Sequence, residues 1–405
     1  MGTIAEKLEY LNTTKAQLRE AINNKGGSLT TSSPFRDYVN AVSAIPSTEQ
    51  HPTYTGSYTA TENGTLQTAG KAMTEDVVVH VISHGILEDA WNAWKANHPT
   101  SWGGAFACSF SDTTVFAPIN LSSLDFSGSE NVVNITNMFK NSSFKSVPLF
   151  NTSNVTTMNS TFYGCFSLTS VPLYDTSSVT TMESMFYNCS NLTNVPLFDT
   201  SSVTTMKEMF YGCFNFENVP LFNTSNVANM SAMFSHCSWL TSVPAFDTSN
   251  VRYMGYMFDY CSRLSDIPSF NTLNVKDMSY MFERCTRLTT VPAFDTSNVT
   301  DMRYMFNYCS SLTTVPAFDT SKVTRMDSMF DGCSNLETIH MHGMKVTFKI
   351  SASTKFTREA LIEIINNCAD LTGGTAQRFV MGSTNLAKLT DEDKAIATNK
   401  NWTLL

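Results

Sequence analysis

The sequence predicts an α/β repeat solenoid of 24-residue units, preceded by a helical/coiled-coil module and a small β module and followed by a C-terminal α/β cap. A unit such as DTSNVTDMRYMFNYCSSLTTVPAF is too short to bury its apolar side alone, so successive copies must stack. Two sets of residues keep the 24-residue step, namely Cys165, Cys189, Cys213, Cys237, Cys261, Cys285, Cys309 and Cys333, and Pro148, Pro172, Pro196, Pro220, Pro244, Pro268, Pro292 and Pro316.

Each unit is expected to contain a helix followed by a short extended segment. The helix is predicted by apolar residues that share one helical face, Val299, Met302, Met305, Phe306 and Cys309. The Thr-Ser-Asn triplet in front is expected to offer oxygen acceptors to the first helical amides. The extended segment is predicted by apolar residues at every third position, Leu312, Val315 and Phe318.

These repeats place the solenoid at residues 131–337, between an N-terminal cap at 85–130 and a C-terminal cap at 338–405. The C-terminal cap is expected to hold a helix in FTREALIEIINNCADL and a strand in QRFVMG. A second helix should open with a capping box from Thr390 to Asp393, and WTLL should form a last strand.

The N-terminal third predicts two further modules. Residues 1–46 hold two amphipathic helices, and their apolar spacing fits either a short coiled coil or a hairpin that packs on itself. Residues 47–84 alternate polar and apolar side chains around an Asn63-Gly64 turn, which predicts a small β module. The residues expected to mediate anchoring or oligomerisation are Leu8, Leu11, Leu18, Ile22, Tyr38 and Val42.

Composition argues against several classes of function. With a net charge of −9 and 26 Lys plus Arg, there is no basic stripe for nucleic acid. No apolar run approaches the roughly 18 residues that a membrane helix needs, and the start MGTIAEKLEYL does not have the pattern of a signal peptide. We therefore expect no membrane insertion. No catalytic-triad, paired-carboxylate, P-loop or zinc spacing occurs, so neither an enzyme nor a cofactor is expected.

Two ladders of repeated residues have a chemical interpretation and a structural one. The cysteines could form bridges between coils, but burial as small apolar residues is favoured. A second ladder could hold calcium, yet Asp and Asn interchange along it and turns favour both, so no metal is expected. Its members are Asn151, Asp175, Asp199, Asn223, Asp247, Asn271, Asp295 and Asp319.

The candidate binding residues are departures from the repeat consensus. The fifth and ninth positions after the repeat valine are small or mixed polar in early copies and become aromatic in later ones. Exposed tyrosine and arginine are typical of binding hot spots, and flat aromatic faces suit sugar rings. The alternative is that the tyrosines simply cover the helix row. The predicted ligand-binding set is Tyr253, Tyr256, Tyr260, Tyr280, Arg284, Arg303, Tyr304 and Tyr308.

The repeat pattern V-x-x-M-x-x-M-F-x-x-C-x-x-L-x-x-V-P-x-F resembles the BspA-like leucine-rich repeats of bacterial and mycoplasma surface lipoproteins, which are associated with adhesion. The segments MGTIAEKLEYLNTTKAQLREAINNKG and YTATENGT resemble modules at the start of tailed-phage virion proteins. The ending KLTDEDKAIATNKNWTLL is similar to that of phage-encoded repeat proteins. Together these resemblances imply a leucine-rich-repeat-like solenoid in a bacteriophage.

The resemblances imply a virion appendage, a tail or head fibre, that is assembled in the host cytoplasm and acts extracellularly. Its N-terminal module would contact other virion proteins and form a homo-oligomer, and its solenoid would recognise a host-surface glycan or protein. Two alternatives remain, a bacterial cell-surface adhesin and a purely structural or decorative virion protein.

Overall fold

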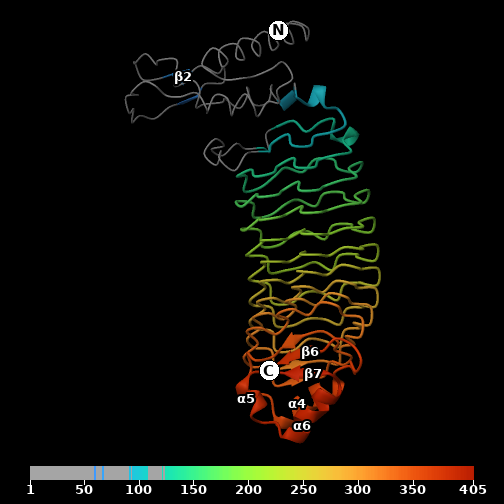
Figure 1. Cartoon of the computed structure of the whole chain (residues 1–405). Helices are drawn as coiled ribbons and strands as arrows, with labels where there is room; N and C mark the ends of the chain where they lie inside the picture. The colour runs from blue at the N-terminus through green and yellow to red at the C-terminus, as the bar shows by residue number, and fades with distance from the viewer. Residues whose placement is uncertain (1–58, 61–65, 68–90, 93, 108–120, 122–123) are drawn as a thin grey trace, which may run out of the picture.

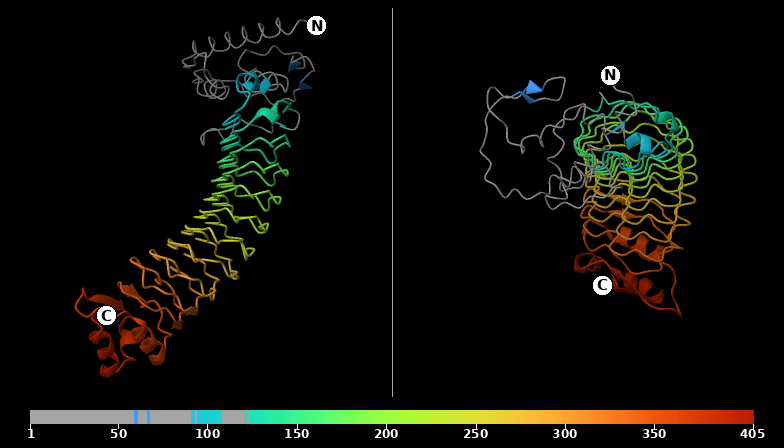
Figure 2. Two further views of the ribbon diagram at one scale, coloured as in Figure 1. Left: turned by 90° about the vertical axis from the view of Figure 1, so that its right-hand side faces the viewer. Right: turned by 90° about the horizontal axis from the view of Figure 1, so that it is seen from above.

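In the computed structural model, the repeats stack into one curved solenoid that ends in a compact cap (Figures 1 and 2). The structure describes residues 59–60, 66–67, 91–92, 94–107, 121 and 124–405. The predicted anchoring residues of the 1–46 module lie outside this set, so their role stays a prediction.

The solenoid coils contain turns where the sequence predicts helices. Residues 132–337, all of which the structure describes, contain no α-helix. The predicted helical face is nevertheless buried, and Met278 and Cys285 are both fully inaccessible to solvent. The helix prediction is wrong because tight turns bury the same residues and also allow alternate backbone amides to bond to the neighbouring coil.

Alternate backbone amides bond within a coil and between coils. The amide of Met305 donates to the Met302 carbonyl at 3.3 Å, which closes a turn. The next amide along the chain, that of Phe306, donates to the Met329 carbonyl in the following coil at 3.1 Å. This alternation continues through the segment, so most of its backbone groups find partners without a helix.

Left-handed residues make this alternation possible. The fifth and ninth positions after the repeat valine have positive φ in successive coils, for example 62° at Tyr256 and 58° at Tyr260. Glycine fills the ninth position in some coils, including Gly212 with a φ of 69°. Side chains with a Cβ pay a steric cost in this region, so the coil shape is locally strained wherever glycine is absent.

The Thr-Ser-Asn triplets link coils and do not cap helices. The Thr296 hydroxyl donates to the Asp319 carbonyl of the next coil at 2.9 Å. Asn298 reaches the other way, with its side-chain amide 2.9 Å from the Leu273 carbonyl of the previous coil. The triplet therefore ties each coil to both of its neighbours at the corner.

The core consists of ladders that run along the solenoid axis. The repeat phenylalanines stack almost in parallel, with ring centroids 5.7 Å apart between Phe258 and Phe282. The cysteine ladder lies beside them, and each thiol donates to a phenylalanine carbonyl of the preceding coil, as Cys285 does to Phe258 at 3.1 Å. The nine cysteines that the structure describes are free and buried, which agrees with the packing interpretation.

Short strands and single bridges join the coils. One parallel pair, β3 (Thr314–Val315) with β4 (Thr338–Ile339), joins the last two coils. Elsewhere, bridges recur at the second residue after the valine, as between Asp277 and Asp301.

The N-terminal end of the solenoid is closed by aromatic rings. Residues 91–92 and 94–97 are helical, and Trp91 packs edge-on against Trp102 at 5.0 Å. A 3₁₀ turn, η3 (Ser129–Asn131), leads into the coils. In the predicted β module, β1 (Thr59–Ala60) and β2 (Leu66–Gln67) pair antiparallel on either side of the predicted turn.

The C-terminal cap has the predicted elements. A parallel sheet of order β5-β6-β7 packs with helices at the end of the solenoid (Figure 1). The helix α6 opens with the predicted capping box, in which Thr390 and Asp393 bond reciprocally. The elements are β5 (Phe348–Lys349), α4 (Arg358–Asn367), β6 (Gln377–Val380), α5 (Ser383–Leu386), α6 (Asp391–Asn399) and β7 (Trp402–Leu404).

The left-handed positions give a direct test of this backbone. Ala232 has a φ of 54° and no ring to stack, so Ala232→Gly removes steric cost and little else. We expect the free energy of unfolding to rise by about 0.5–1 kcal/mol, because relief of about 1–2 kcal/mol exceeds the extra backbone entropy of glycine. Urea unfolding of the full chain measures it. The reverse change Gly212→Ala should destabilise, since its new Cβ would also collide with the Asn188 side chain.

Candidate functional site

The predicted binding residues separate into two stacked rows. Tyr256, Tyr280 and Tyr304, at the fifth position of three consecutive coils, form the short row. Their ring centroids are 4.3 Å and 4.6 Å apart, with the planes nearly parallel. This spacing is the distance between coils, so each ring lies directly against the next.

The ninth position forms a second and longer row. The Tyr260 ring stacks on His236 at 4.4 Å. The Arg284 guanidinium lies between two rings, 4.9 Å from the Tyr260 centroid and 4.6 Å from that of Tyr308. Both geometries are those of cation–π contacts, which hold the arginine in one place.

The long row continues toward the N-terminus through residues that the sequence prediction missed. Tyr163, Tyr187 and Tyr211 stack at 4.5 Å and 4.4 Å, and Lys140 lies over the first ring. These tyrosines occupy the eighth position, and the row passes to the ninth between Tyr211 and His236, whose rings are 5.1 Å apart. The 24-residue period of these tyrosines is visible in the sequence. Their continuity with His236 and Tyr260 is not, because the row changes from the eighth to the ninth position of the repeat.

Stacking leaves ring edges exposed and covers ring faces. Tyr280 has a ring on both sides, and Tyr308 has Arg284 on one side and Gly332 on the other. A Cβ at Gly332 would lie only 2.7 Å from Tyr308 Cδ1, which shows how closely that coil approaches the ring. For tyrosines with a neighbour on both sides, such as Tyr280 and Tyr308, the expectation of flat faces open to sugars is therefore wrong. They offer hydroxyls and ring edges.

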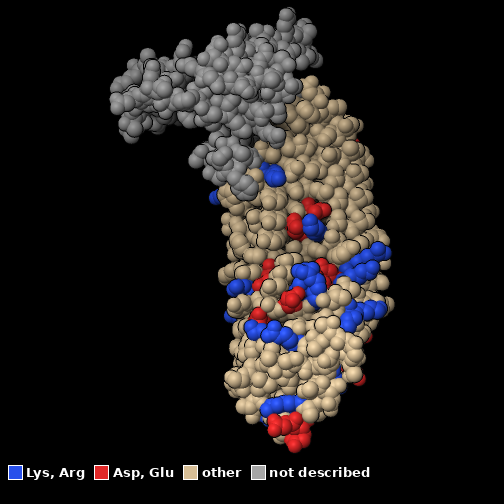
Figure 3. All heavy atoms as spheres, viewed as in Figure 1, with Lys and Arg blue, Asp and Glu red and all other residues tan. Residues whose placement is uncertain are grey.

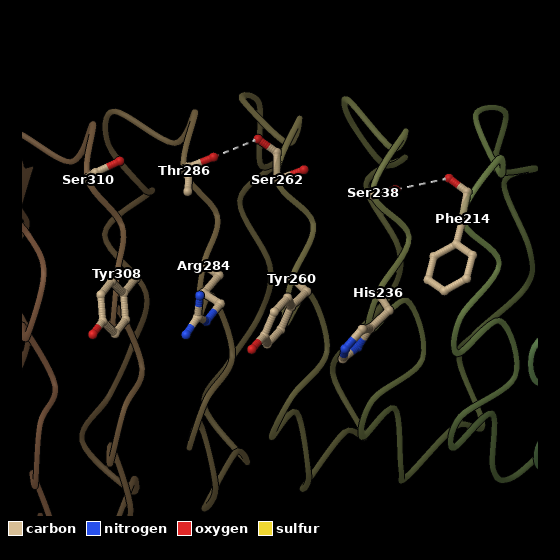
Figure 4. A pocket seen from close by; sticks show the side chains of 9 residues that line it. All are labelled: Phe214, His236, Ser238, Tyr260, Ser262, Arg284, Thr286, Tyr308 and Ser310. Atoms are coloured by element: carbon tan, nitrogen blue, oxygen red, sulfur yellow. Dashed lines mark hydrogen bonds between the residues drawn. The ribbon is translucent and has the colours of Figure 1, made fainter.

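A shallow groove runs beside the long row (Figure 4). It has a volume of about 420 Å³, and Phe214 lies at its N-terminal end. One side is formed by His236, Tyr260, Arg284 and Tyr308. The other is a hydroxyl row of Ser238, Ser262, Thr286 and Ser310.

The remaining two predicted residues lie apart from the groove lining. Tyr253 is 47% exposed and belongs to the row of backbone bridges. Arg303 is engaged within the chain, because its Nε and Nη2 atoms lie 2.9 Å and 2.8 Å from the Asp301 carboxylate. The structure thus brings Tyr260, Arg284 and Tyr308 together in the groove lining, and the other predicted tyrosines lie outside that lining.

Aromatic side chains with exposed rings were also missed. Phe214 and Trp239 are 45% and 47% exposed and lie in adjacent coils, joined by the Trp239 amide and the Phe214 carbonyl at 3.1 Å. The guanidinium of Arg263 covers part of Trp239, 4.4 Å from its ring. At each of these two positions most other coils have a small or polar residue. This departure from the repeat is the sequence signal that could have identified them.

A buried carboxylate lies beneath the long row. Asp259 is 5% exposed, and its Oδ2 atom accepts from the Ser235 hydroxyl at 3.2 Å and lies 3.9 Å from His236 Nδ1. Burial, followed by the nearby charge of Glu283, raises the pKa of Asp259 to about 7. Burial also lowers the pKa of His236 and raises that of Glu283. All three shifts reduce the charge that these groups carry near neutral pH.

The Asp/Asn ladder closes turns, as its interchangeable residues predicted. The Asp199 carboxylate accepts from the Ser201 amide at 2.9 Å, and the other corners repeat this bond. Among the residues that the structure describes, no group of three or more His, Cys, Asp or Glu side chains is arranged to hold a metal ion. Within that same part of the chain, no helix has the length and apolar character needed to cross a bilayer.

Comparison with known families matches most of the solenoid. A family described as "Mycoplasma protein of unknown function, DUF285" matches residues 105–219, 214–312 and 286–358, which together cover more than half of the chain. The chain belongs to this family. Its matched region coincides with the coils that carry both rows and the groove. No curated protein matches the chain.

Solved leucine-rich-repeat structures show a distant likeness. A leucine-rich repeat protein from Eubacterium ventriosum is 19% identical, with 56% of this chain and 74% of that chain covered and a TM-score of 0.32. The ectodomain of the plant receptor kinase GASSHO1/SCHENGEN3 from Arabidopsis thaliana, in complex with CASPARIAN STRIP INTEGRITY FACTOR 2, is 12% identical. There the match covers 68% of this chain and 38% of the ectodomain, with a TM-score of 0.20. Neither superposes well enough to serve as a guide to function.

The buried carboxylate predicts a pH-dependent stability. Unfolded Asp259 ionises near 3.8 and the folded residue near 7, so the stability that its bound proton gives is lost as pH rises between these values. Asp259→Asn should therefore raise the free energy of unfolding at about pH 8, by on the order of 1–3 kcal/mol. Asn307 fills the equivalent buried position two coils later, so an amide fits. Urea unfolding should show the gain shrinking toward about pH 5, and a gain independent of pH would contradict the assignment.

Proposed function

We propose that this chain is a non-enzymatic recognition protein that binds a cell-surface ligand through the coils carrying the short row and the groove. The observation that carries the proposal is the presence of bulky side chains at left-handed backbone positions. Tyr260, Arg284 and Tyr308 have φ between 56° and 58°, where an earlier coil has Gly212. Strain of this kind costs on the order of 1–3 kcal/mol per residue and tends to occur at functional sites.

The core does not require these side chains. The same methionine, phenylalanine and cysteine ladders lie beneath every coil from Val179 onward. Both left-handed positions nevertheless carry large aromatic or cationic side chains together only in the coils of Tyr256, Tyr280 and Tyr304. Tyr256, Tyr260 and Tyr308 are 39–50% exposed, so packing accounts for only part of their surface. Exposed tyrosine and arginine beside a groove are the composition expected of a binding surface.

We further propose that the protein acts as a tail or head fibre of a phage virion, recognising a host-surface glycan or protein. This finer proposal rests on the resemblance of the first 26 residues and of the KLTDEDKAIATNKNWTLL ending to phage proteins. The alternatives are a bacterial cell-surface adhesin and a purely structural virion protein. Particle localisation separates the virion roles from the adhesin.

Cell binding tests the recognition proposal. Two double variants, Tyr260→Ala with Tyr308→Ala and Tyr280→Ala with Tyr304→Ala, remove the exposed edges of one row each. Alanine fits the backbone there, because Ala232 has a φ of 54° at the fifth position. We expect the melting temperature to stay within a few degrees, and at least one variant to lose tenfold or more in affinity, about 1.4 kcal/mol. Flow cytometry of the labelled full chain on a panel of bacterial strains measures this.

The control for this experiment is a second exposed row. Leu173 and Leu197 are each 61% exposed, in the segment that follows the repeat proline. Alanine at both positions should leave cell binding unchanged. Unchanged binding in both tyrosine variants, with the fold retained, would contradict recognition by these rows.

The N-terminal module gives a separate prediction about assembly. Deleting residues 1–46 should leave the solenoid folded, because none of the core ladders comes from that segment. The shortened chain should be monomeric by light scattering and absent from purified phage particles. If it kept the oligomeric state of the full chain and still entered particles, the anchoring role would be wrong.

A further inference from the structure

Three arginines beside the groove have no ion-pair partner. Arg263, Arg284 and Arg287 form no salt bridge with any residue that the structure describes. Arg303 and Arg325, by contrast, both lie near the Asp301 carboxylate. On the face shown in Figure 3, charged side chains gather over the middle of the solenoid, while the N-terminal coils carry few. Arg284 therefore lines the groove as a cation without an ion-pair partner among the described residues.

Arg284 is held ready to bind a carboxylate. Its guanidinium lies between the Tyr260 and Tyr308 rings and its Nε atom is buried, so only the edge formed by its two Nη groups remains for other partners. That edge matches a carboxylate through two parallel hydrogen bonds. Because two rings already fix the side chain, binding costs less conformational entropy than it would for a free surface arginine.

The rest of the groove offers the contacts that a sugar chain requires. Figure 4 shows the polar ends of His236, Tyr260, Arg284 and Tyr308 in line, one coil apart, opposite the hydroxyl row. Sugar hydroxyls need such a series of donors and acceptors. A sugar ring also needs an open aromatic face, and Phe214 provides one at the N-terminal end of the groove.

Burial reduces the tendency of two carboxylates near Arg284 to ionise. Asp259 and Glu283 both act on Arg284, but burial raises the pKa of each, that of Asp259 to about 7. The ion pairs of the described residues do not include Arg284, and Arg263 and Arg287 directly follow Ser262 and Thr286 of the hydroxyl row in the sequence. The balance at the groove favours an anion.

We propose that this groove binds an acidic glycan that runs across the coils, with a sugar ring on Phe214 and a carboxylate on Arg284. This inference rests on the proposed recognition function and names its ligand class. It also assigns different tasks to the two ends of the groove, stacking at Phe214 and charge pairing at Arg284.

The test compares charged and neutral forms of the same glycans. The full chain is titrated calorimetrically with polygalacturonate, alginate, hyaluronate and polysialate, each beside its carboxyl-reduced form. At least one acidic form should bind tenfold or more tightly than its reduced form, and its affinity should fall as salt rises. Arg284→Gln should abolish that preference and leave binding of the reduced form unchanged. Phe214→Ala should weaken both forms.

Matched variants separate charge from fold. Arg325→Gln removes a cation that already lies 3.8 Å from Asp301, and it should leave acidic-glycan affinity unchanged. Arg284→Lys should keep the charge and recover only part of the affinity, because lysine lacks the planar pair of donors. Equal binding of acidic and reduced forms, no binding of any acidic form, or full affinity in Arg284→Gln would each overturn the inference. If tyrosine-dependent cell binding persists in those cases, recognition stands and only the ligand class is wrong.

Discussion

The coil-to-coil hydrogen bond of alternate backbone amides is the constraint on which the rest of the structure depends. In one coil the amides of Met302, Tyr304, Phe306 and Tyr308 bond to the next coil, while those of Met305, Asn307 and Cys309 close turns within it. This pattern requires a left-handed residue at two fixed positions. A left-handed residue with a Cβ costs conformational free energy. Hydrogen bonding and packing against both neighbouring coils offset that cost.

The same constraint turns single residues into rows. Hydrogen-bonded backbones hold neighbouring coils at the spacing of β-strands, so equivalent side chains come into van der Waals contact. Buried phenylalanines stack for this reason, and so do the exposed tyrosines. Stacking stabilises a row and makes it rigid, but each ring covers a face of the ring next to it. A side chain with neighbours on both sides presents edges, hydroxyls and charges, whereas Phe214, at an irregular position, is 45% exposed.

The stacking of coils fixes the positions and hydrogen-bond partners of the polar groups inside them. Each cysteine thiol is directed to a phenylalanine carbonyl of the preceding coil, and burial raises the pKa of Cys189 well above its usual value. Such a thiol reacts slowly, because the thiolate is the reactive form. Asp259 is less completely hydrogen-bonded, because its Oδ1 atom is buried without a hydrogen-bond partner among the described residues. Its carboxylate lies 3.9 Å from Nδ1 of His236, which lines the groove.

The sequence alone determined the period, the buried ladders, the solenoid and the elements of the C-terminal cap. Burial follows from apolar spacing, and residues such as Met302 and Phe306 are inaccessible whether their segment is a helix or a series of turns. For that reason the spacing could not decide between the two backbones. Only contact with a neighbouring coil, which offers carbonyls to alternate amides, selected the turns.

The candidate site also combines features that the sequence predicted with features that only the tertiary structure decided. The sequence placed tyrosines and Arg284 in consecutive coils, but a helix would have merged the fifth and ninth positions into one patch with open ring faces. The turns separate them into two rows, and the close approach of coils covers the faces. The continuation through Tyr211 into His236 depends on where each turn directs its side chains. Tertiary stacking therefore decided which side-chain atoms the surface exposes, because side-chain direction depends on the backbone that neighbouring coils impose.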